Sequence, residues 1–386
     1  MEKDGSEGVG MNRAPENRIN WIGQFLLIGL SVLLTVWLLL SMLCMDSSRT
    51  GGSPVDVDLM EDLDRHLSNH ISIALSGVTD VERVYQLRDG DLVAPKPDPE
   101  NFGETEDPAR LSRLLEEAAS VMKGQNALFT PQTQIKEGSK VQYYLDETIF
   151  ALTWKQVVDD SVYTFCEVKV VHPSQFRRFL SEGAYGSGVL HTTTEMSESV
   201  NAVVASSGDY YGYRSIGIVI NNGRIFRDRG HLLDTCYIDD KGDMLFSYAG
   251  EIVDEATAQK FVEENNVRFS LSFGPVMIRD GDCCVPNTYN SGEINGDYAR
   301  SALCQLGELH YAVVVANTEN PHLCVPTVRE FACNLQEMGI STAYALDGGQ
   351  TAAIAMNNQL INKVSYGAQR EISDIIYFAT ALPENR

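Results

Sequence analysis

The chain has 386 residues and a formal net charge of −23 at pH 7, which makes it strongly acidic. Nucleic-acid affinity rests on Lys and Arg side chains that neutralise phosphates, and the sequence contains no Lys/Arg-rich run. These two features exclude nucleic acid as a partner. The length suffices for one large domain and a smaller one.

An apolar segment near the N-terminus, Trp21 to Met45, carries no charge and is rich in Leu, Ile, Val and Trp. It exceeds the roughly 20 residues that span a bilayer, and no small-residue cleavage site precedes Asp46. We therefore expect an uncleaved signal anchor in the cell membrane. Three cations lie before the segment and one lies close after it, which predicts a cytoplasmic N-terminus and an extracellular remainder.

The stalk that follows the anchor is predicted to be helical. Leu and Ile recur every four residues from Leu59 to Leu75, which is one stripe of an amphipathic helix. A second helix is expected to begin with Asp107 as N-cap and Pro108 in the first turn, and to continue through Lys123. The predicted organisation is a cytoplasmic tail (1–18), a transmembrane signal anchor (19–45), a juxtamembrane linker with a helical stalk (46–138) and a globular domain (139–386).

The globular domain is predicted to be α+β, a hairpin-rich mixed sheet with a few packing helices. Apolar runs predict strands at 141–154 and 162–171, and a short helix is expected at 176–182. Turn signals with flanking apolar runs predict hairpins. Two further helices are expected, the second with Thr327 as N-cap, Glu330 completing a capping box and Gly339 as C-cap. The hairpin turns are expected at 221–223, 239–242 and 279–282, and the helices at 254–265 and 327–338.

The eight cysteines do not form a recognisable framework. Cys44 falls in the predicted anchor, and the odd number that is left argues against a fully paired secreted scaffold. No CxxC spacing indicates zinc. Most are expected to be small buried apolar residues, which leaves room for one or two disulfides.

A mostly apolar run from Thr342 to Leu346 ends at Asp347, Gly348 and Gly349. An aspartate at the end of a buried strand is where a sheet would present a reactive group, and a glycine pair lets the backbone come close to a ligand. The alternative is a hairpin turn, because Asp-Gly between apolar runs is a strong hairpin signal. Spacing alone favours the turn.

Three other segments occur in order before this one, and together the four resemble the phosphodiester glycosidase family, which includes the lysosomal uncovering enzyme. They are Ser207-Gly208-Asp209-Tyr210-Tyr211-Gly212, Ser272-Phe273-Gly274-Pro275, Ala299-Arg300-Ser301-Ala302 and the stretch around Asp347. The likeness covers roughly 141–381 and includes 367–374, which looks like the closing strand of that family. It is closest to membrane-anchored bacterial members.

The resemblance implies hydrolysis of a sugar-1-phosphodiester in a surface glycan or wall polymer, with N-acetylglucosamine as the sugar that the uncovering enzyme removes. Catalytic roles are expected for Asp347 as nucleophile or base, for Arg300 as the phosphate-binding guanidinium, and for Asp209 as a second carboxylate. The same resemblance implies substrate-binding positions at Ser207, Gly208, Gly274, Gly348, Gly349 and Thr351.

No cofactor is required by any spacing, although two converging aspartates would suit Ca²⁺ or Mg²⁺. Two other functions remain open. Ser207 stands where the family usually has asparagine, so the domain could bind glycans without turnover. A structural envelope protein with an acidic surface is the third hypothesis.

Overall fold

The computed structural model describes residues 85–88, 90–122, 135–136, 138–289, 294–296, 298–318 and 325–383. The expected tail, signal anchor and first stalk helix lie outside these residues. Within them, no helix combines the length and the apolar character that crossing a bilayer requires. The chain divides at residue 82, and the described residues all belong to the second unit, 83–386.

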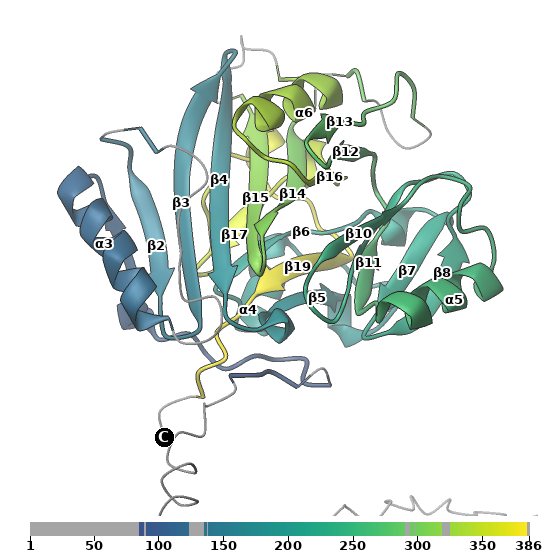
Figure 1. The fold of residues 1–386 in the computed structure, drawn as a ribbon, viewed down its shortest axis with the longest axis horizontal. Helices are drawn as coiled ribbons and strands as arrows, with labels where there is room; N and C mark the ends of the chain where they lie inside the picture. The colour runs from purple at the N-terminus through teal and green to yellow at the C-terminus, as the bar shows by residue number, and fades with distance from the viewer. Residues whose placement is uncertain are drawn as a thin grey trace, which may run out of the picture. The chain divides into compact units, whose positions relative to one another are not determined.

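A large antiparallel sheet of nine strands forms the centre of this unit (Figure 1). Every strand pair in the described residues is antiparallel, which corrects the mixed sheet expected from the sequence. In spatial order the nine strands are β1 (Phe102–Thr105), β2 (Val141–Leu145), β3 (Ile149–Val158), β4 (Ser161–Val170), β15 (His310–Asn317), β14 (Arg300–Gly307), β16 (Ala343–Leu346), β12 (Val276–Arg279) and β13 (Asp282–Cys283).

Three smaller sheets accompany the large one. A five-stranded sheet has the order β18 (Gln359–Leu360), β17 (Ile354–Met356), β6 (Val204–Ser207), β19 (Asp374–Phe378) and β5 (Phe176–Leu180). A three-stranded sheet has the order β10 (Met244–Ser247), β9 (Thr235–Ile238) and β11 (Phe269–Leu271), and β7 (Gly217–Asn221) pairs with β8 (Arg224–Arg229).

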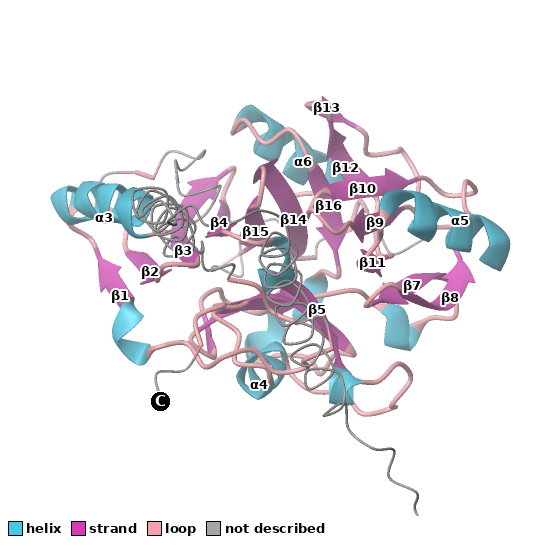
Figure 2. Cartoon of the chain, turned by 60° about the horizontal axis from the view of Figure 1, so that its bottom comes forward, coloured by secondary structure: helices cyan, strands magenta, loops and turns pink. Residues whose placement is uncertain are grey.

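Four α-helices lie in the described residues, and the sequence predicted three of them. Figure 2 shows two of the predicted ones, α3 and α5, at opposite ends of the unit. The expected N-caps Asp107 and Thr327 accept hydrogen bonds from the first turn, and Asp254 does the same at the start of α5. The short helix α4 was not predicted, although Thr192 and Glu195 form a capping box there. The four are α3 (Pro108–Val121), α4 (Thr193–Ser199), α5 (Glu255–Asn265) and α6 (Val328–Glu337).

The large sheet is covered on both faces. One face packs against α3 and α6 through a core that contains Leu114, Trp154 and Phe331. The opposite face packs against the five- and three-stranded sheets. Because α3 and the strand β2 share the first core, the second expected stalk helix packs into the same core as the globular domain.

Residues 176–182 form a strand and a short 3₁₀ turn, which corrects the expected helix. The reason is tertiary: β5 pairs with β19, and Phe176 stacks on Phe378 with ring centroids 4.5 Å apart. The closing strand likewise begins only at Asp374, so most of 367–374 is loop rather than strand. The run 141–154 is two strands, because Asp146 accepts the amide hydrogen of Thr148 at 2.6 Å and turns the chain between β2 and β3.

The three predicted hairpin turns are confirmed. They join β7 to β8, β9 to β10 and β12 to β13. In each turn a residue with positive φ occupies the tight position: Asn222 (50°), Gly242 (89°) and Asp280 (54°). These turns depend on local backbone preference, which explains why the sequence reveals them.

Truncation of Phe176 tests the packing between the sheets. Its ring is fully buried and also lies 5.2 Å from Phe269 and 4.8 Å from Tyr311. We expect Phe176→Ala to lower the free energy of unfolding by about 3–5 kcal/mol, since it leaves a cavity between two sheets. Val157→Ala, at a side chain 61% exposed, should change it by about 0.5 kcal/mol or less. Urea unfolding measures both, and equal losses would contradict this account of the core.

Candidate functional site

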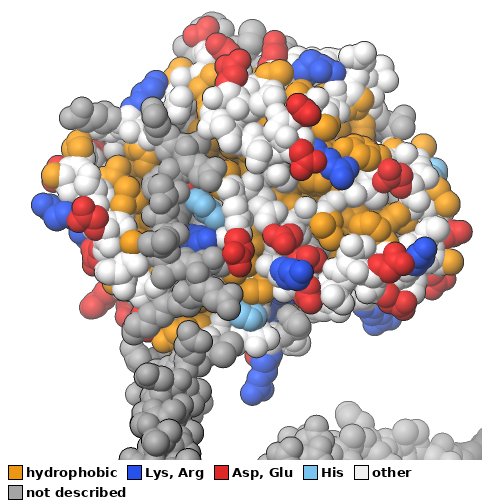
Figure 3. All heavy atoms as spheres, in the orientation of Figure 1, with side chains coloured by type: hydrophobic (Ala, Val, Ile, Leu, Met, Phe, Trp, Pro, Cys, Tyr) orange, Lys and Arg blue, Asp and Glu red, His pale blue; other side chains and the backbone are white. Residues whose placement is uncertain are grey.

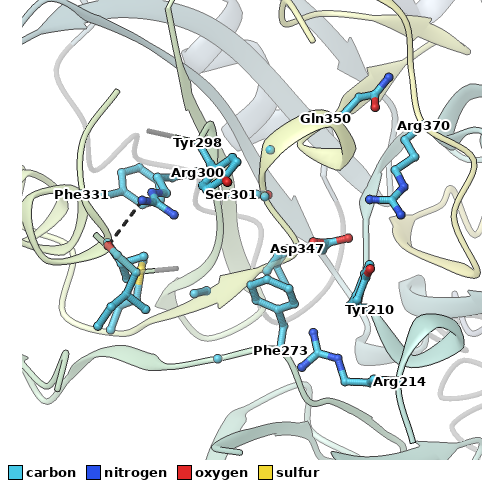
Figure 4. Close-up of a pocket in the computed structure, with 18 of the residues that line it drawn as sticks. Tyr210, Arg214, Phe273, Tyr298, Arg300, Ser301, Phe331, Asp347, Gln350 and Arg370 are labelled. Atoms are coloured by element: carbon cyan, nitrogen blue, oxygen red, sulfur yellow. Dashed lines mark hydrogen bonds between the residues drawn. The ribbon is translucent and has the colours of Figure 1, made fainter. Parts of the chain in front are cut away.

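A pocket of about 610 Å³ opens at the end of β16, where the strand delivers Asp347 (Figure 4). Its walls come from six separate stretches of the chain. Of the expected site residues, Asp347, Arg300, Gly274, Gly348 and Gly349 line it. Aromatic, aliphatic and cationic side chains also line it, among them Tyr210, Arg214, Phe273, Tyr298, Val328, Phe331, Tyr366 and Arg370.

Asp347 is largely buried, with 8% of its surface exposed. Burial raises the pKa of its carboxyl to about 7, because the protein interior disfavours the charged form. The nearby charge of Asp209 raises the pKa further, whereas the neighbouring Thr351 hydroxyl and the charges of Arg214 and Arg370 lower it. The result is a carboxyl group that exchanges a proton near neutral pH. The segment is not a hairpin turn, since β16 and β17 belong to different sheets.

Two arginines that the sequence analysis did not select flank this carboxyl. The Arg214 guanidinium lies 4.9 Å from the centre of the Tyr210 ring and 5.0 Å from that of Phe273. The Arg370 guanidinium lies 4.6 Å from the Tyr213 ring centre. Figure 4 shows both on the same side of the pocket as Asp347. Stacking on aromatic rings holds a guanidinium in place at the pocket wall.

Arg300 occupies the opposite wall, near Phe331 (Figure 4). Its Nε donates to the carbonyl oxygen of Pro326 at 2.9 Å, and its Nη2 donates to the carbonyl oxygens of Ile294 and Gly296. Arg300 therefore ties β14 to the segment that leads into α6. Its hydrogen bonds fix the pocket wall.

Asp209 is fully buried beneath the pocket and is not among its lining residues. Its Oδ2 lies 3.6 Å from Nη2 of Arg178, whose Nε lies 2.8 Å from Oδ2 of Asp374. The amide of Ser272 donates to Asp209 Oδ2 at 2.8 Å. Two carboxylates thus share one buried guanidinium. Burial raises the pKa of Asp374, and the Arg178 charge opposes that rise.

The glycines of the expected site allow close chain contacts. A Cβ on Gly208 would lie 2.5 Å from Oδ2 of Asp374, and a Cβ on Gly348 would lie 2.5 Å from the carbonyl oxygen of Ala299. The amide of Gly349 donates to that same oxygen at 2.7 Å. Gly208 thus makes room for the buried ion cluster, and the glycine pair lets the Asp347 loop close against β14.

Ser207 and Thr351 are buried and do not line the pocket. The Thr351 hydroxyl donates to the carbonyl oxygen of Gly348 at 2.6 Å, beside Asp347. Ser207 lies in β6 opposite Ile375 of β19. Among the described residues, no group of three or more His, Cys, Asp or Glu is arranged to hold a metal ion.

Comparison with known proteins identifies the family of this region. Residues 199–379 match the family model described as phosphodiester glycosidase. This part of the chain is a phosphodiester glycosidase family domain. The match contains all four of the sequence segments and the arginines at 214 and 370, whereas strands β1 to β5 precede it.

The fold of the glycosidase domain has a counterpart among solved structures. The catalytic domain of zebrafish N-acetylglucosamine-1-phosphodiester alpha-N-acetylglucosaminidase, auto-inhibited by its pro-peptide, aligns with a TM-score of 0.50 and 16% identity over 72% of this chain and 88% of that one. A Synechocystis protein described only as hypothetical aligns with a TM-score of 0.43 and 12% identity, over 60% of this chain and 62% of that one. No curated protein matches.

The raised pKa of Asp347 predicts a pH-dependent effect on stability. The carboxyl titrates near 4 in the unfolded chain and near 7 in the fold. Its stabilising protonated form is therefore fully present below about pH 4 and is lost as pH rises through 7. We expect Asp347→Asn to be more stable than the natural chain at pH 8, by about 2–4 kcal/mol.

At pH 4 this advantage should disappear, because both side chains are then neutral. Urea unfolding at the two pH values measures the difference. If Asp347→Asn raises the free energy of unfolding by the same amount at pH 4 and at pH 8, the pKa of Asp347 is not raised in the fold.

Proposed function

We propose that this protein hydrolyses a sugar-1-phosphodiester and releases a free sugar and a phosphomonoester. The observation that carries the proposal is a carboxyl group with a pKa of about 7 facing two ring-stacked arginines in one pocket. The glycosidase family match supports the reaction class. N-acetylglucosamine is the first sugar to test, since it is the sugar that the zebrafish enzyme is named for.

Arg214 and Arg370 bind the phosphodiester group. A guanidinium carries a positive charge and presents parallel N–H donors that match two phosphate oxygens. As the bond between the anomeric carbon and the phosphate oxygen breaks, negative charge grows on the phosphate. The two cations stabilise that charge in a partly dry pocket. The phosphate is a weak base, so no strong general acid is needed to release it.

Asp347 acts as the general base. Its carboxylate takes a proton from a water molecule, the water oxygen bonds to the anomeric carbon, and the phosphate leaves with the electrons of the broken bond. A base with a pKa near the working pH gives the best balance of basicity and deprotonated fraction. Direct attack by water inverts the anomeric configuration.

The remaining site residues position these groups. Arg300 holds the wall opposite Asp347 through backbone carbonyls, and Asp209 belongs to the buried cluster below. The backbones of Gly274, Gly348 and Gly349 border the substrate space. Thr351 orients Asp347, and Ser207 and Gly208 support the Asp209 segment.

We place the reaction outside the cell, on a protein anchored in the membrane by Trp21 to Met45. The uncharged length of that segment supports this placement. The substrate class is then a surface glycan or wall polymer that contains sugar-1-phosphodiester links. Acidic and basic side chains are interspersed on the face shown in Figure 3.

A second candidate function is glycan binding without turnover. It is favoured by two exposed tyrosines that line the pocket, Tyr298 (45%) and Tyr366 (87%). Aromatic rings at a pocket mouth suit the apolar face of a sugar. The experiment below separates the two functions.

The full chain in detergent micelles should release N-acetylglucosamine from its 1-(methyl phosphate) diester. The ratio kcat/KM should rise with pH through about 7 and then level off, because the base must be deprotonated. Asp347→Asn should lower kcat by about 10²–10⁴-fold while the diester still binds. Sugar release followed by NMR also shows the anomeric configuration of the first product.

If the natural chain binds the diester but releases no sugar, the protein is a glycan-binding module and not an enzyme. Neither binding nor release would favour the structural envelope protein. Retention of configuration would make Asp347 a nucleophile instead of a base.

Arg214→Lys and Arg370→Lys test the phosphate contact. An ammonium group cannot make the two parallel contacts, so each variant should lose about 10-fold or more in kcat/KM, which corresponds to about 1.4 kcal/mol. Arg224→Lys is the matched control, since Arg224 also lies over an aromatic ring, that of Phe226, but does not line the pocket. If the control loses as much activity as the two variants, the effect does not come from phosphate binding.

A further inference from the structure

Two cysteines that are distant in sequence lie on neighbouring elements beside the pocket. Cys283 ends β13 and Cys333 lies on α6, and these two elements pack against each other. Both side chains are partly exposed, and both thiols are free. In contrast, Cys166, Cys236 and Cys304 are fully buried.

Hydrogen bonds on either side align the two cysteines. Along α6, Arg329 and Gln336 lie four residues before and three residues after Cys333, so all three side chains share one helix face. Gln336 Nε2 donates to the carbonyl oxygen of Gly281 at 2.5 Å, two residues before Cys283.

Arg329 Nη2 donates to the carbonyl oxygen of Val285, two residues after Cys283. It also donates to Oδ1 of Asn287 at 3.3 Å. These hydrogen bonds from Arg329 and Gln336 hold α6 against the hairpin at two points, one on each side of Cys333. Cys333 therefore lies opposite Cys283.

The electrostatics of the thiols agree with this alignment. Burial, and after it the neighbouring Cys283 thiol, raise the pKa of Cys333. The adjacent Cys284 has different partners: its Sγ lies 3.3 Å from the carbonyl oxygen of Asp282. Cys283 packs against the core that contains Phe331, whereas Cys284 packs against the core on the opposite face of the large sheet, which separates the two neighbours.

We propose that Cys283 and Cys333 are a disulfide site that links α6 to the β12–β13 hairpin. In an oxidising compartment, a small-molecule disulfide such as oxidised glutathione is the oxidant. The two thiols lose two protons and two electrons and form one S–S bond, while the oxidant is reduced to two thiols. The two elements that carry the cysteines already pack against each other.

The bond would fix one wall of the pocket. Val328 and Phe331 of α6 line the pocket, and the carbonyl oxygen of Pro326, just before the helix, accepts from Arg300. This inference does not depend on the proposed reaction, since it rests only on how α6 lies against the hairpin.

Peptide mapping of the full chain tests the proposal without any variant. The chain is incubated with oxidised glutathione, remaining thiols are alkylated, and the protein is digested without reductant. We expect one linked peptide pair that contains Cys283 and Cys333 and that separates on reduction. Free alkylated thiols at both positions, or a link from either one to another cysteine, would overturn the proposal.

Thermal unfolding gives the second measurement. A cross-link that closes a loop of this length should raise Tm by roughly 5–10 °C in the oxidised form. Cys333→Ser should lose this shift, and Cys284→Ser, the control at the neighbouring cysteine, should keep it. A shift that persists in Cys333→Ser would assign the effect to a different pair.

Discussion

A buried ion cluster underlies the whole site. Arg178 of β5 lies between Asp374 of β19 and Asp209 of the loop after β6, and all three side chains are fully buried. Buried charges are stable only when paired and hydrogen-bonded, and here two carboxylates share a single cation. Removal of Arg178 would leave two buried carboxylates without their cation, so the three elements must keep their relative positions.

This cluster sets the position of the groups above it. Asp209 is followed directly by Tyr210, the ring on which Arg214 stacks. The amide of Asp347 donates to the carbonyl oxygen of Gly208, at 3.4 Å, so the end of β16 lies against the same segment. The charge of Asp209 also raises the pKa of Asp347. One carboxylate thus influences both the arrangement and the protonation of the pocket without lining it.

Sequence reasoning worked where the signal was local and failed where it was not. Capping residues such as Thr327 and turn residues such as Asn222 act within a few positions, and these elements were predicted correctly. The strand β5 was misread as a helix because its identity comes from pairing with β19 about two hundred residues later.

The same distinction applies to the site. Asp347 could be selected because an acid followed by two glycines is a local pattern. Arg214 and Arg370 carry no such pattern, and only the fold places them over the rings of Tyr210 and Tyr213. Both lie inside or next to stretches that the family resemblance had already marked, 207–212 and 367–374. For Arg214, its place directly after a tyrosine-rich motif was the signal that could have found it.

The arginines and the carboxyl also act on each other through the substrate. In the free pocket, Arg214 and Arg370 hold the pKa of Asp347 below the value that burial alone would give. In the proposed reaction, a bound phosphodiester neutralises part of their positive charge, so this lowering weakens and the carboxylate becomes a stronger base. The departing phosphate then gains further negative charge, which favours the proton on Asp347 until the product leaves. Binding of the anion and uptake of the proton therefore assist one another, because the same two cations stabilise both negative groups.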